Sequence, residues 1–386
     1  WEWVFATAPR INTLLEDHAA LDAFNVCLRG IGQVVFMNNP WSGLVILLAM
    51  AWQSAYCAAM GVVGLVSSTG LAVALGLDRG AVRSGLFGFN GFLVGLGLAT
   101  FDRGCQLDPD CRLGDWQYGV VVVPVVLCGM FSTIFAVALG NLLVPVYSVP
   151  SFTLPFNFAA LLFLGTALTS RSFPQPFTQA LMPKVDDAEA VGGIDLAAAL
   201  EAIPKGVGQV FLADSTASGV LVILGVALCS PIAAACAVWG SFLGVATSVL
   251  MQCPSEAVYD GLAGYNAVLG TMAVTGMFFY PSRRSFLMGS LCGVMCTFTQ
   301  WALVSALTPL GLPTLTLPFC LATITFVLAQ RSVEGLEPVP LGSVTTPEGH
   351  ILDYAGRHGA ADDKAPPKEG ARDPEEGGAA GDSSDV

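Results

Sequence analysis

Long apolar runs separated by short polar stretches dominate the chain as far as Arg331. A membrane-spanning helix needs about 20 predominantly apolar residues. Reading for such runs predicts ten, at roughly 42–58, 59–77, 84–101, 119–140, 156–169, 219–235, 236–251, 261–280, 285–307 and 319–330. The runs at 156–169 and 319–330 cover only about half a bilayer. Each follows a proline, Pro155 or Pro318, which indicates a helix that begins at mid-membrane depth.

The pattern occurs twice along the chain. Gly32-Gln33-Val34 recurs as Gly208-Gln209-Val210, and the segment from Gly85 to Asn90 recurs at the same offset in residue number, 176. A proline-bracketed motif, PSFTLPF at 150–156, recurs at 313–319 as PTLTLPF, at an offset of 163. The shorter offset matches a longer loop in the first half, around residues 101–118. Hydrophobicity alone does not require Gln, Asn or Pro at these positions, so the pattern indicates a duplication.

An odd number of crossings in each duplicated half places the two halves in opposite orientations. We therefore predict an all-α integral membrane protein, an inverted repeat of two five-helix halves that each end in a half-helix. With both termini cytoplasmic, Arg79, Arg83, Arg283 and Arg284 fall in inside loops, as the positive-inside rule requires. The predicted segments are a cytoplasmic N-terminal segment (1–29), two transmembrane repeats (30–170 and 206–331), an extracellular linker (171–205) and a disordered acidic cytoplasmic tail (332–386).

Composition agrees with a membrane protein. Hydrophobic residues make up 54% of the chain and charged residues 12%, against about 25% charged in a soluble domain. From Glu334 onward there are twelve acidic and four basic residues, so the tail supplies −8 of the net charge of −13. This balance argues against a nucleic-acid partner.

Most of the eleven cysteines lie in apolar runs, where they act as small hydrophobes. Cys105 and Cys111 share a polar loop and can pair only if that loop is extracellular. We expect no metal, no cofactor and no enzymatic activity.

A few polar side chains interrupt the apolar runs. We expect Gln33 and Gln209 to face a pore, because polar groups at membrane depth usually line a cavity or bind another helix. Thr153 and Thr316 precede the half-helices, in stretches whose prolines prevent regular helix. Their carbonyls and hydroxyls are expected to face each other across a pseudo-two-fold axis. The polar groups at helix breaks are interpreted as caps and interhelical contacts: Asn38, Asn39, Asp214, Ser215 and Thr216.

Ionisable groups are scarce in the apolar runs. The three histidines, His18, His350 and His358, lie in terminal segments. Coupled carriers usually need intramembrane ionisable groups, and ion pores need charged rings or carbonyl cages. Amides, hydroxyls and carbonyls between aromatic walls suit a small, neutral, planar solute. Three alternatives remain: a channel for ammonia or another small neutral solute, an ion-coupled carrier of a small amide that uses Asp214, and a scaffold or receptor that works through its tail.

Four segments resemble the urea transporter family: GQVVFMNNPWSG at 32–43, GLFGFN at 85–90, TLPF at 153–156 and LPTLTLPF at 312–319. The resemblance extends from about Leu28 to Arg331. It implies an inverted repeat of five membrane helices plus one tilted re-entrant helix per half. It also implies a homotrimer in the plasma membrane, with one pore per protomer, that passes urea passively down its gradient.

The resemblance also implies roles for individual residues. Gln33 and Gln209 would mark an outer dehydration site, and Thr153 and Thr316 the narrow centre beside ladders of carbonyl oxygens. The slots that clamp the two faces of urea would be formed by Phe36, Phe89, Leu93, Val210, Tyr265 and Leu269. From spacing alone, Phe89 and Leu93 share one helix face, as do Tyr265 and Leu269, and simple helix packing is the alternative to a lining role. Tyr265 stands where the family pattern has Phe, and Asp214 lies where it has a second proline-containing break.

Overall fold

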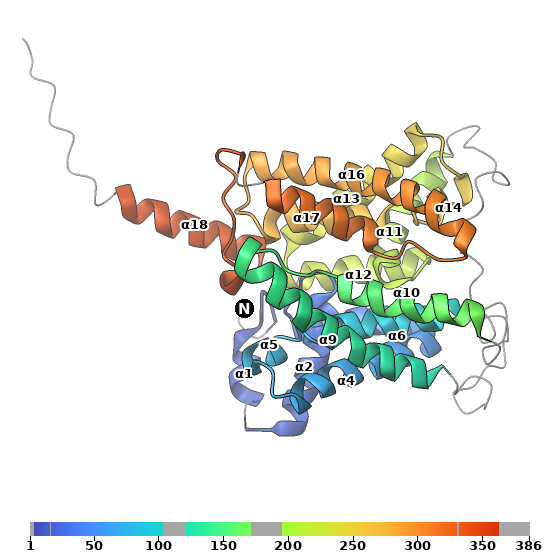
Figure 1. Ribbon diagram of the computed structural model, residues 1–386. Helices are drawn as coiled ribbons and strands as arrows, with labels where there is room; N and C mark the ends of the chain where they lie inside the picture. Colours follow the sequence, from blue (N-terminus) through green and yellow to red (C-terminus); the bar gives the residue numbers. More distant parts are fainter. Residues whose placement is uncertain (1–3, 16, 103–120, 171–194, 330–331, 363–386) are drawn as a thin grey trace, which may run out of the picture.

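The computed structural model describes residues 4–15, 17–102, 121–170, 195–329 and 332–362. These residues form helices and connecting segments, with a single isolated β-bridge between Phe279 and Pro338. The long helices lie side by side and run roughly along one direction (Figure 1). The loop with Cys105 and Cys111 lies outside the described residues.

The first half of the chain builds α1 to α10. Its helices are α1 (Pro9–Leu15), α2 (Ala19–Gln33), α3 (Pro40–Gln53), α4 (Ala55–Ala74), α5 (Arg79–Arg83), α6 (Phe89–Phe101), α9 (Val122–Tyr147) and α10 (Leu154–Thr169). The predicted segment boundary between residues 29 and 30 falls inside α2, and the one between 205 and 206 falls inside the corresponding helix of the second half.

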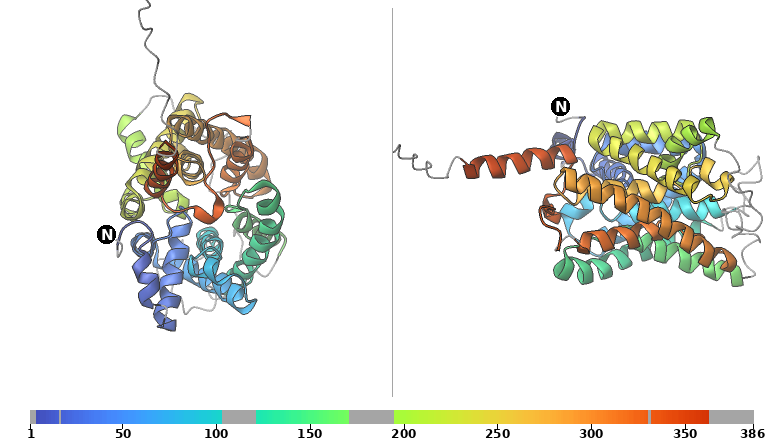
Figure 2. Two further views of the ribbon diagram at one scale, coloured as in Figure 1. Left: turned by 90° about the vertical axis from the view of Figure 1, so that its left-hand side faces the viewer. Right: turned by 90° about the horizontal axis from the view of Figure 1, so that it is seen from above.

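The second half repeats this order of elements. It contains α11 (Leu196–Gly208), η1 (Gln209–Phe211), α12 (Thr216–Cys229), α13 (Pro231–Leu250), α14 (Ser255–Tyr259), α15 (Tyr265–Met272), η2 (Ala273–Met277), α16 (Arg283–Leu307), η3 (Thr308–Leu310) and α17 (Leu317–Ala329). The bounds of α12, α13 and α14 are those of α3, α4 and α5 shifted by the larger offset of the sequence repeat. Seen end-on, the two halves occupy opposite sides of the molecule (Figure 2, left).

Backbone conformation repeats together with the helices. Phe36 and Leu212, which are equivalent positions of the repeat, have φ of +65° and +58°. Phe152 and Leu315, which are also equivalent, both have φ of +49°. A bulky residue in this left-handed region is strained, and such strain persists only where the surrounding structure imposes it. The same strained turns therefore belong to both halves.

Two of the predicted helix boundaries are wrong. The sequence pattern placed breaks at 58/59 and 235/236, whereas α3 ends at Gln53 and α12 ends at Cys229. Ser54 and Ser230 are extended, and their side chains accept the backbone N–H groups of Cys57 and Ala233. A serine that caps the next helix interrupts the backbone within a continuous apolar run. Hydropathy therefore cannot locate the break.

Four described helices are long and apolar enough to cross a membrane: Ala55–Ala74, Val122–Tyr147, Pro231–Leu250 and Arg283–Leu310. The pair Leu196–Phe211 and Thr216–Cys229 passes the same test as one broken span, bent by 71°. The shorter apolar helices α3, α6, α10 and α17 complete the bundle. α3 packs against α12, and α10 contacts α17, so helices from both halves meet along the middle of the molecule.

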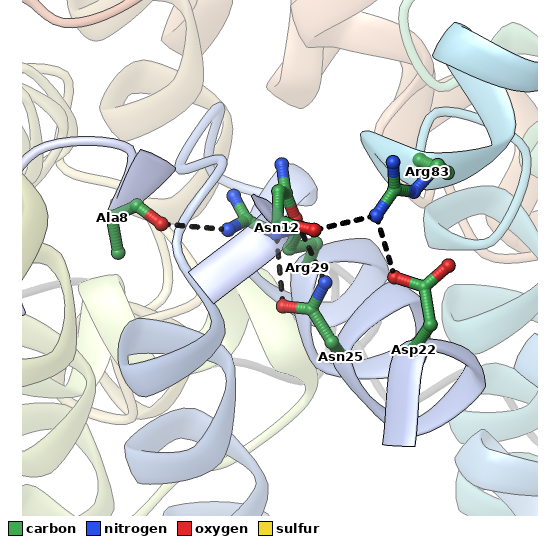
Figure 3. A network of polar contacts seen from close by, with 6 residues as sticks. All are labelled: Ala8, Asn12, Asp22, Asn25, Arg29 and Arg83. Carbon is green, nitrogen blue, oxygen red and sulfur yellow. Dashed lines mark hydrogen bonds and ion pairs between the residues drawn. The ribbon is translucent and has the colours of Figure 1, made fainter. Parts of the chain in front are cut away.

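The N-terminal residues are fixed by a buried arginine. Arg29 is fully buried, and its guanidinium donates to the carbonyls of Ala8 at 3.2 Å and Asn38 at 2.8 Å. It also donates to Asn25, which in turn bonds Asn12. Arg83 extends the network by binding Asp22 and the Asn12 carbonyl (Figure 3). Because Arg29 finds carbonyl acceptors, this charge within α2 is a structural clamp.

The expectation of disorder from residue 332 onward is wrong for residues 332–362. This stretch contains α18 (Pro347–Asp362), which projects from one end of the bundle (Figure 1). The Val339 N–H donates to the Phe278 carbonyl, and Leu336 and Val339 are buried. His350 is also buried, so this part of the tail packs against the bundle although its composition is polar. The rest of the expected tail lies outside the described residues.

Candidate functional site

The two repeated threonines meet at the centre of the molecule. Thr153 Oγ1 and Thr316 Oγ1 lie 2.6 Å apart, and both residues are buried. Thr153 is the N-cap residue of α10, and Thr316 directly precedes α17. The amino ends of two half-helices therefore converge at the hydroxyl pair. Their positive dipole ends make this point unfavourable for cations and compatible with a neutral solute.

A buried asparagine on each side anchors the half-helix. Asn90 Oδ1 accepts the N–H of Phe156 at 3.1 Å, and Asn266 Oδ1 accepts the N–H of Phe319 at the same distance. The Asn266 amide also donates to the Leu315 carbonyl at 3.2 Å. These bonds use N–H groups that have no partner inside a first helical turn. The asparagines thus determine the positions of the two threonines.

A cavity of about 530 Å³ reaches Thr316 from one end of the bundle. Five of the residues proposed from the sequence line it: Leu93, Gln209, Val210, Tyr265 and Thr316. Leu212, Leu315 and Phe156 form part of the same wall. Asp214 and Asp260 also line this cavity, and Asp214 is exposed and accepts a hydrogen bond from Gln53 at 2.6 Å. The lining is therefore polar at Gln209 and the carboxylates, and aliphatic and aromatic toward the threonines.

Phenylalanines pack tightly on the other side of the threonine pair. The Phe36 ring meets the Phe278 ring edge-on, with centroids 5.7 Å apart, and lies 6.3 Å from that of Phe319. Phe152 meets Phe278 and Phe319 at 5.3 and 5.2 Å. In the other half, Leu212 and Leu315 occupy the positions equivalent to Phe36 and Phe152 and line the cavity. The smaller leucines explain why the open space lies on their side.

The structure separates the two glutamines that the sequence placed in one outer site. Gln209 lines the cavity and donates to the Asp260 carbonyl, which follows α14. Gln33 donates to the Ser84 carbonyl, which follows α5. Figure 1 shows α5 and α14 at opposite ends of the bundle, so each glutamine belongs to its own end. In both cases the amide binds a backbone carbonyl and supports a turn.

The remaining predicted residues divide between the two ends. Leu93 lines the cavity, whereas Phe36, Phe89 and Leu269 are not among its lining residues. Leu269 is fully buried and Phe89 is half-buried against the apolar core. The extra hydroxyl of Tyr265 donates to the Leu315 carbonyl at 2.7 Å. That bond gives a carbonyl beside Thr316 a second donor, whereas a phenylalanine at this position would leave it with the Asn266 amide alone.

Sequence interpretation missed several residues around the centre. Asn157, one turn into α10, donates to the Thr153 carbonyl at 2.8 Å and to Thr316 Oγ1 at 3.0 Å. Cys320, its counterpart in the second half, has Sγ 3.2 Å from Thr153 Oγ1. Phe278, which closes the aromatic cluster, lies at the end of an apolar run. One signal could have revealed Asn157: it is a polar residue in the first turn of an apolar helix. At the starts of these two helices the sequence interpretation considered only the threonines.

Comparison with known proteins agrees with this geometry. Residues 24–331 match the family model described as Urea transporter. The chain belongs to the urea transporter family. Urea transporter 1 of Ovis aries is 34% identical over 346 residues, which cover 89% of this chain and 86% of the relative. Urea transporter 1 of Mus musculus is 32% identical over 345 residues with the same coverage. Membership and the apolar helices make the chain an integral membrane transporter of the channel type, not an enzyme.

Proposed function

We propose that this chain passes urea down its concentration gradient through a path that crosses the Thr153–Thr316 pair. The observation that carries the proposal is the meeting of the two half-helix amino ends at these hydroxyls, 2.6 Å apart, with a cavity that reaches Thr316. Urea is planar, with apolar faces, four N–H donors and one oxygen acceptor. The hydroxyls can replace part of its hydration at the narrowest point, where an unpaired polar group would cost about 1–3 kcal/mol.

The pair must separate for urea to pass. A 2.6 Å contact between two oxygens leaves no room for any solute. The central gap therefore opens only when each hydroxyl gives up its bond to the other and binds the solute instead. On either side, aliphatic and aromatic side chains contact the faces of urea and exclude hydrated ions. The proposed lining residues are Gln33, Phe36, Phe89, Leu93, Thr153, Gln209, Val210, Tyr265, Leu269 and Thr316.

The finer architecture belongs to the same proposal. The halves are inverted with respect to each other, each with a broken span and a half-helix. The placement of α5 and α14 at opposite ends supports the inversion, because these helices occupy equivalent positions in the repeat (Figure 1). The protein is a plasma-membrane homotrimer with one pore per protomer, and both termini face the cytoplasm. Arg79, Arg83, Arg283 and Arg284 support that orientation.

The ion-coupled alternative depends on a carboxylate within the membrane. Asp214, its best candidate, is exposed at the cavity and bonded to Gln53. A coupling residue has to change its protonation or ion occupancy inside the barrier. An exposed carboxylate at the wide end of the path cannot couple ion movement to passage through the centre.

Stopped-flow light scattering on proteoliposomes tests the proposal. Vesicles with the protein should equilibrate urea much faster than protein-free vesicles from the same preparation. The rate should stay unchanged when a proton or sodium gradient is imposed and then collapsed with ionophores. Urea accumulation against its gradient would establish the coupled carrier instead, and a rate equal to that of empty vesicles would refute urea conduction.

A further inference from the structure

Asn157 is fully buried beside the threonine pair, and only its amide nitrogen is paired. Nδ2 donates one hydrogen to the Thr153 carbonyl and the other to Thr316 Oγ1. Oδ1 is buried and has no hydrogen-bond partner among the described residues. Because the Thr153 carbonyl can only accept a hydrogen bond, the Asn157 amide must turn Nδ2 toward it. This orientation leaves Asn157 Oδ1 unpaired.

The two halves differ at this position. Cys320 stands where the repeat places the counterpart of Asn157, and its Sγ contacts Thr153 Oγ1 at 3.2 Å. A carboxamide supplies two strong donors, whereas a thiol is a weak donor and a weak acceptor. Around two equivalent threonines, the pore centre therefore has a strong donor on one side and a weak partner on the other.

This difference favours one direction for the hydrogen bonds. Thr316 Oγ1 accepts from Asn157, and its own hydrogen then has one acceptor among the described residues, Thr153 Oγ1. In that arrangement Thr153 Oγ1 donates to Cys320 Sγ. The chain of bonds runs from Asn157 through Thr316 and Thr153 to Cys320. It ends on Cys320 Sγ, the poorest acceptor among these groups, which Asn157 Nδ2 also contacts at 3.8 Å.

Such a chain of bonds presents defined groups to a solute that separates the hydroxyls. The Thr153 hydroxyl can give up its weak acceptor, Cys320 Sγ, and donate to the carbonyl oxygen of urea instead. Oδ1 and Nδ2 of a carboxamide are about 2.3 Å apart, so Oδ1 lies near Thr316 Oγ1, which is 3.0 Å from Nδ2. A urea N–H would supply the partner that Oδ1 lacks. A buried acceptor is costly to leave unpaired, so this bond would favour urea at the barrier.

We propose that Asn157 is a positioning residue of the constriction: it sets the donor direction of the Thr153–Thr316 pair and offers Oδ1 to a passing urea N–H. The inference rests on the proposed urea conduction. It makes the two threonines unequal, although the repeat makes them equivalent in sequence. In the native chain, Thr316→Val removes the acceptor of an Asn157 hydrogen, whereas Thr153→Val leaves that bond intact.

An exchange of the two unlike residues provides the test. Asn157→Cys should lower the urea rate in proteoliposomes about ten-fold. The double variant Asn157→Cys/Cys320→Asn should recover most of that loss, because the amide then donates from the other half and the chain of bonds runs in reverse. The matched control is Asn157→Cys/Cys320→Leu. It restores a side chain of similar size without an amide and should stay slow.

The threonines supply a readout that packing alone would not change. Thr316→Val should slow urea more than Thr153→Val in the native chain, and this order should reverse in the exchanged chain. Recovery with leucine, or an unchanged order of the two valine variants, would overturn the inference while native conduction stands. Absence of urea conduction by the native protein would refute both the proposed function and the inference.

A second comparison applies if the exchanged protein does not fold. Asn157→Leu keeps a side chain of similar size without the amide and should slow urea about ten-fold, whereas Asn157→Ser keeps a hydroxyl donor and should lose less. Serine removes more of the buried side chain than leucine does, so a packing defect would give the opposite order. Equal rates, or a slower serine variant, would overturn the inference.

Discussion

At the residue scale, two leucines and two phenylalanines at equivalent positions make the halves of the pore unlike. Leu212 and Leu315 leave a cavity, whereas Phe36 and Phe152 pack against Phe278. All four residues are held at positive φ, so the backbone already tolerates either side chain at each position. We therefore expect single exchanges of Phe and Leu at these positions to change the selectivity of each end.

Phe36→Leu should widen the path at the aromatic end. The change removes the edge contact with Phe278 and introduces the residue that the other half uses at this point. We expect the permeability ratio of acetamide to urea to rise several-fold in proteoliposomes. Leu212→Phe is the matched control and should lower the rates of both solutes by filling the cavity. An unchanged ratio in Phe36→Leu would show that Phe36 does not line the path.

Asn266→Ala should loosen the start of α17. The substitution leaves the Phe319 N–H without its acceptor and removes a donor to the Leu315 carbonyl. We expect a destabilisation of about 1–3 kcal/mol, seen as a lower melting temperature in detergent, together with slower urea passage. Thr299→Ala, a half-buried position on α16 whose hydroxyl bonds its own helix, serves as control and should change neither. Native stability of the Asn266 variant would contradict the anchoring role.

At the element scale, the segment from Val333 to His350 joins the tail to the aromatic end of the pore. The Val339 N–H donates to the Phe278 carbonyl, and the Tyr280 N–H donates to the Glu337 carbonyl. Glu348 accepts the Ile232 N–H at 2.9 Å and the Ser230 hydroxyl at 2.6 Å, which caps α13. The segment thus supports a helix end and the backbone of Phe278, which belongs to the aromatic cluster.

Truncation after Arg331 should destabilise the protein. It removes the buried Leu336 and Val339 side chains, each worth about 1.5–3 kcal/mol of burial, and the cap on α13. We expect a lower melting temperature and altered urea rates. Truncation after Asp362 should change neither quantity, because it leaves this segment and α18 intact. Identical stability of both truncated proteins would show that the segment does not dock in solution.

His350 should make the docking of this segment dependent on pH. Its Nε2 accepts the Thr345 N–H at 2.9 Å, and its Nδ1 bonds the Gly276 carbonyl at 2.8 Å, so the docked ring is neutral. Burial lowers the pKa of His350 below its ordinary value of 6.5, against the opposing effects of the Gly276 carbonyl, Asp353 and Glu348. Above pH 6.5 the ring is neutral both docked and free. As the pH falls through 6.5, the free form gains a proton first and docking weakens.

Hydrogen exchange of residues 333–350 measures this effect. Protection should be high at pH 7.5 and lower at pH 5, after correction for the intrinsic pH dependence of exchange. His350→Gln should remove most of the difference, because glutamine does not titrate. His18→Gln is the control and should retain it, since His18 is exposed at the start of α2. Protection independent of pH in the native chain would refute the role of His350.

At the scale of the whole molecule, the repeat predicts which surfaces face opposite sides of the membrane. α5 and α14 occupy equivalent positions at opposite ends of the bundle (Figure 1). In the proposed orientation α5 is cytoplasmic and α14 is extracellular. The converging half-helices between them place the barrier near mid-depth, which is where an inverted repeat positions its site.

Cysteine labelling tests this arrangement. Arg79→Cys and Glu256→Cys add exposed thiols on α5 and α14. In intact cells, a membrane-impermeant maleimide should label Glu256→Cys above the native background, and should label Arg79→Cys only after permeabilisation. Labelling of both variants from the same side would rule out the inverted arrangement.

Much of the architecture could be predicted from the sequence because its signals are local or periodic. Apolar runs predicted where the apolar helices lie, prolines predicted where α10 and α17 begin, and the two constant offsets in residue number paired Thr153 with Thr316. The helix breaks at Ser54 and Ser230 escaped prediction, because a capping serine hardly changes hydropathy. The ordered segment at 332–362 escaped it as well, because a polar composition conceals a few buried apolar residues.

Contacts between distant residues were decided by the tertiary structure alone. Sequence equivalence assigned Gln33 and Gln209 one role, but packing placed them at opposite ends, which agrees with the proposed inversion of the two halves. An inverted repeat would bring together only residues close to its axis, and Thr153 and Thr316 do come together. In our proposal the donor direction of their hydrogen bonds depends on Asn157 and Cys320. Two equivalent hydroxyls have no preferred donor, so only a residue that differs between the repeats can set one.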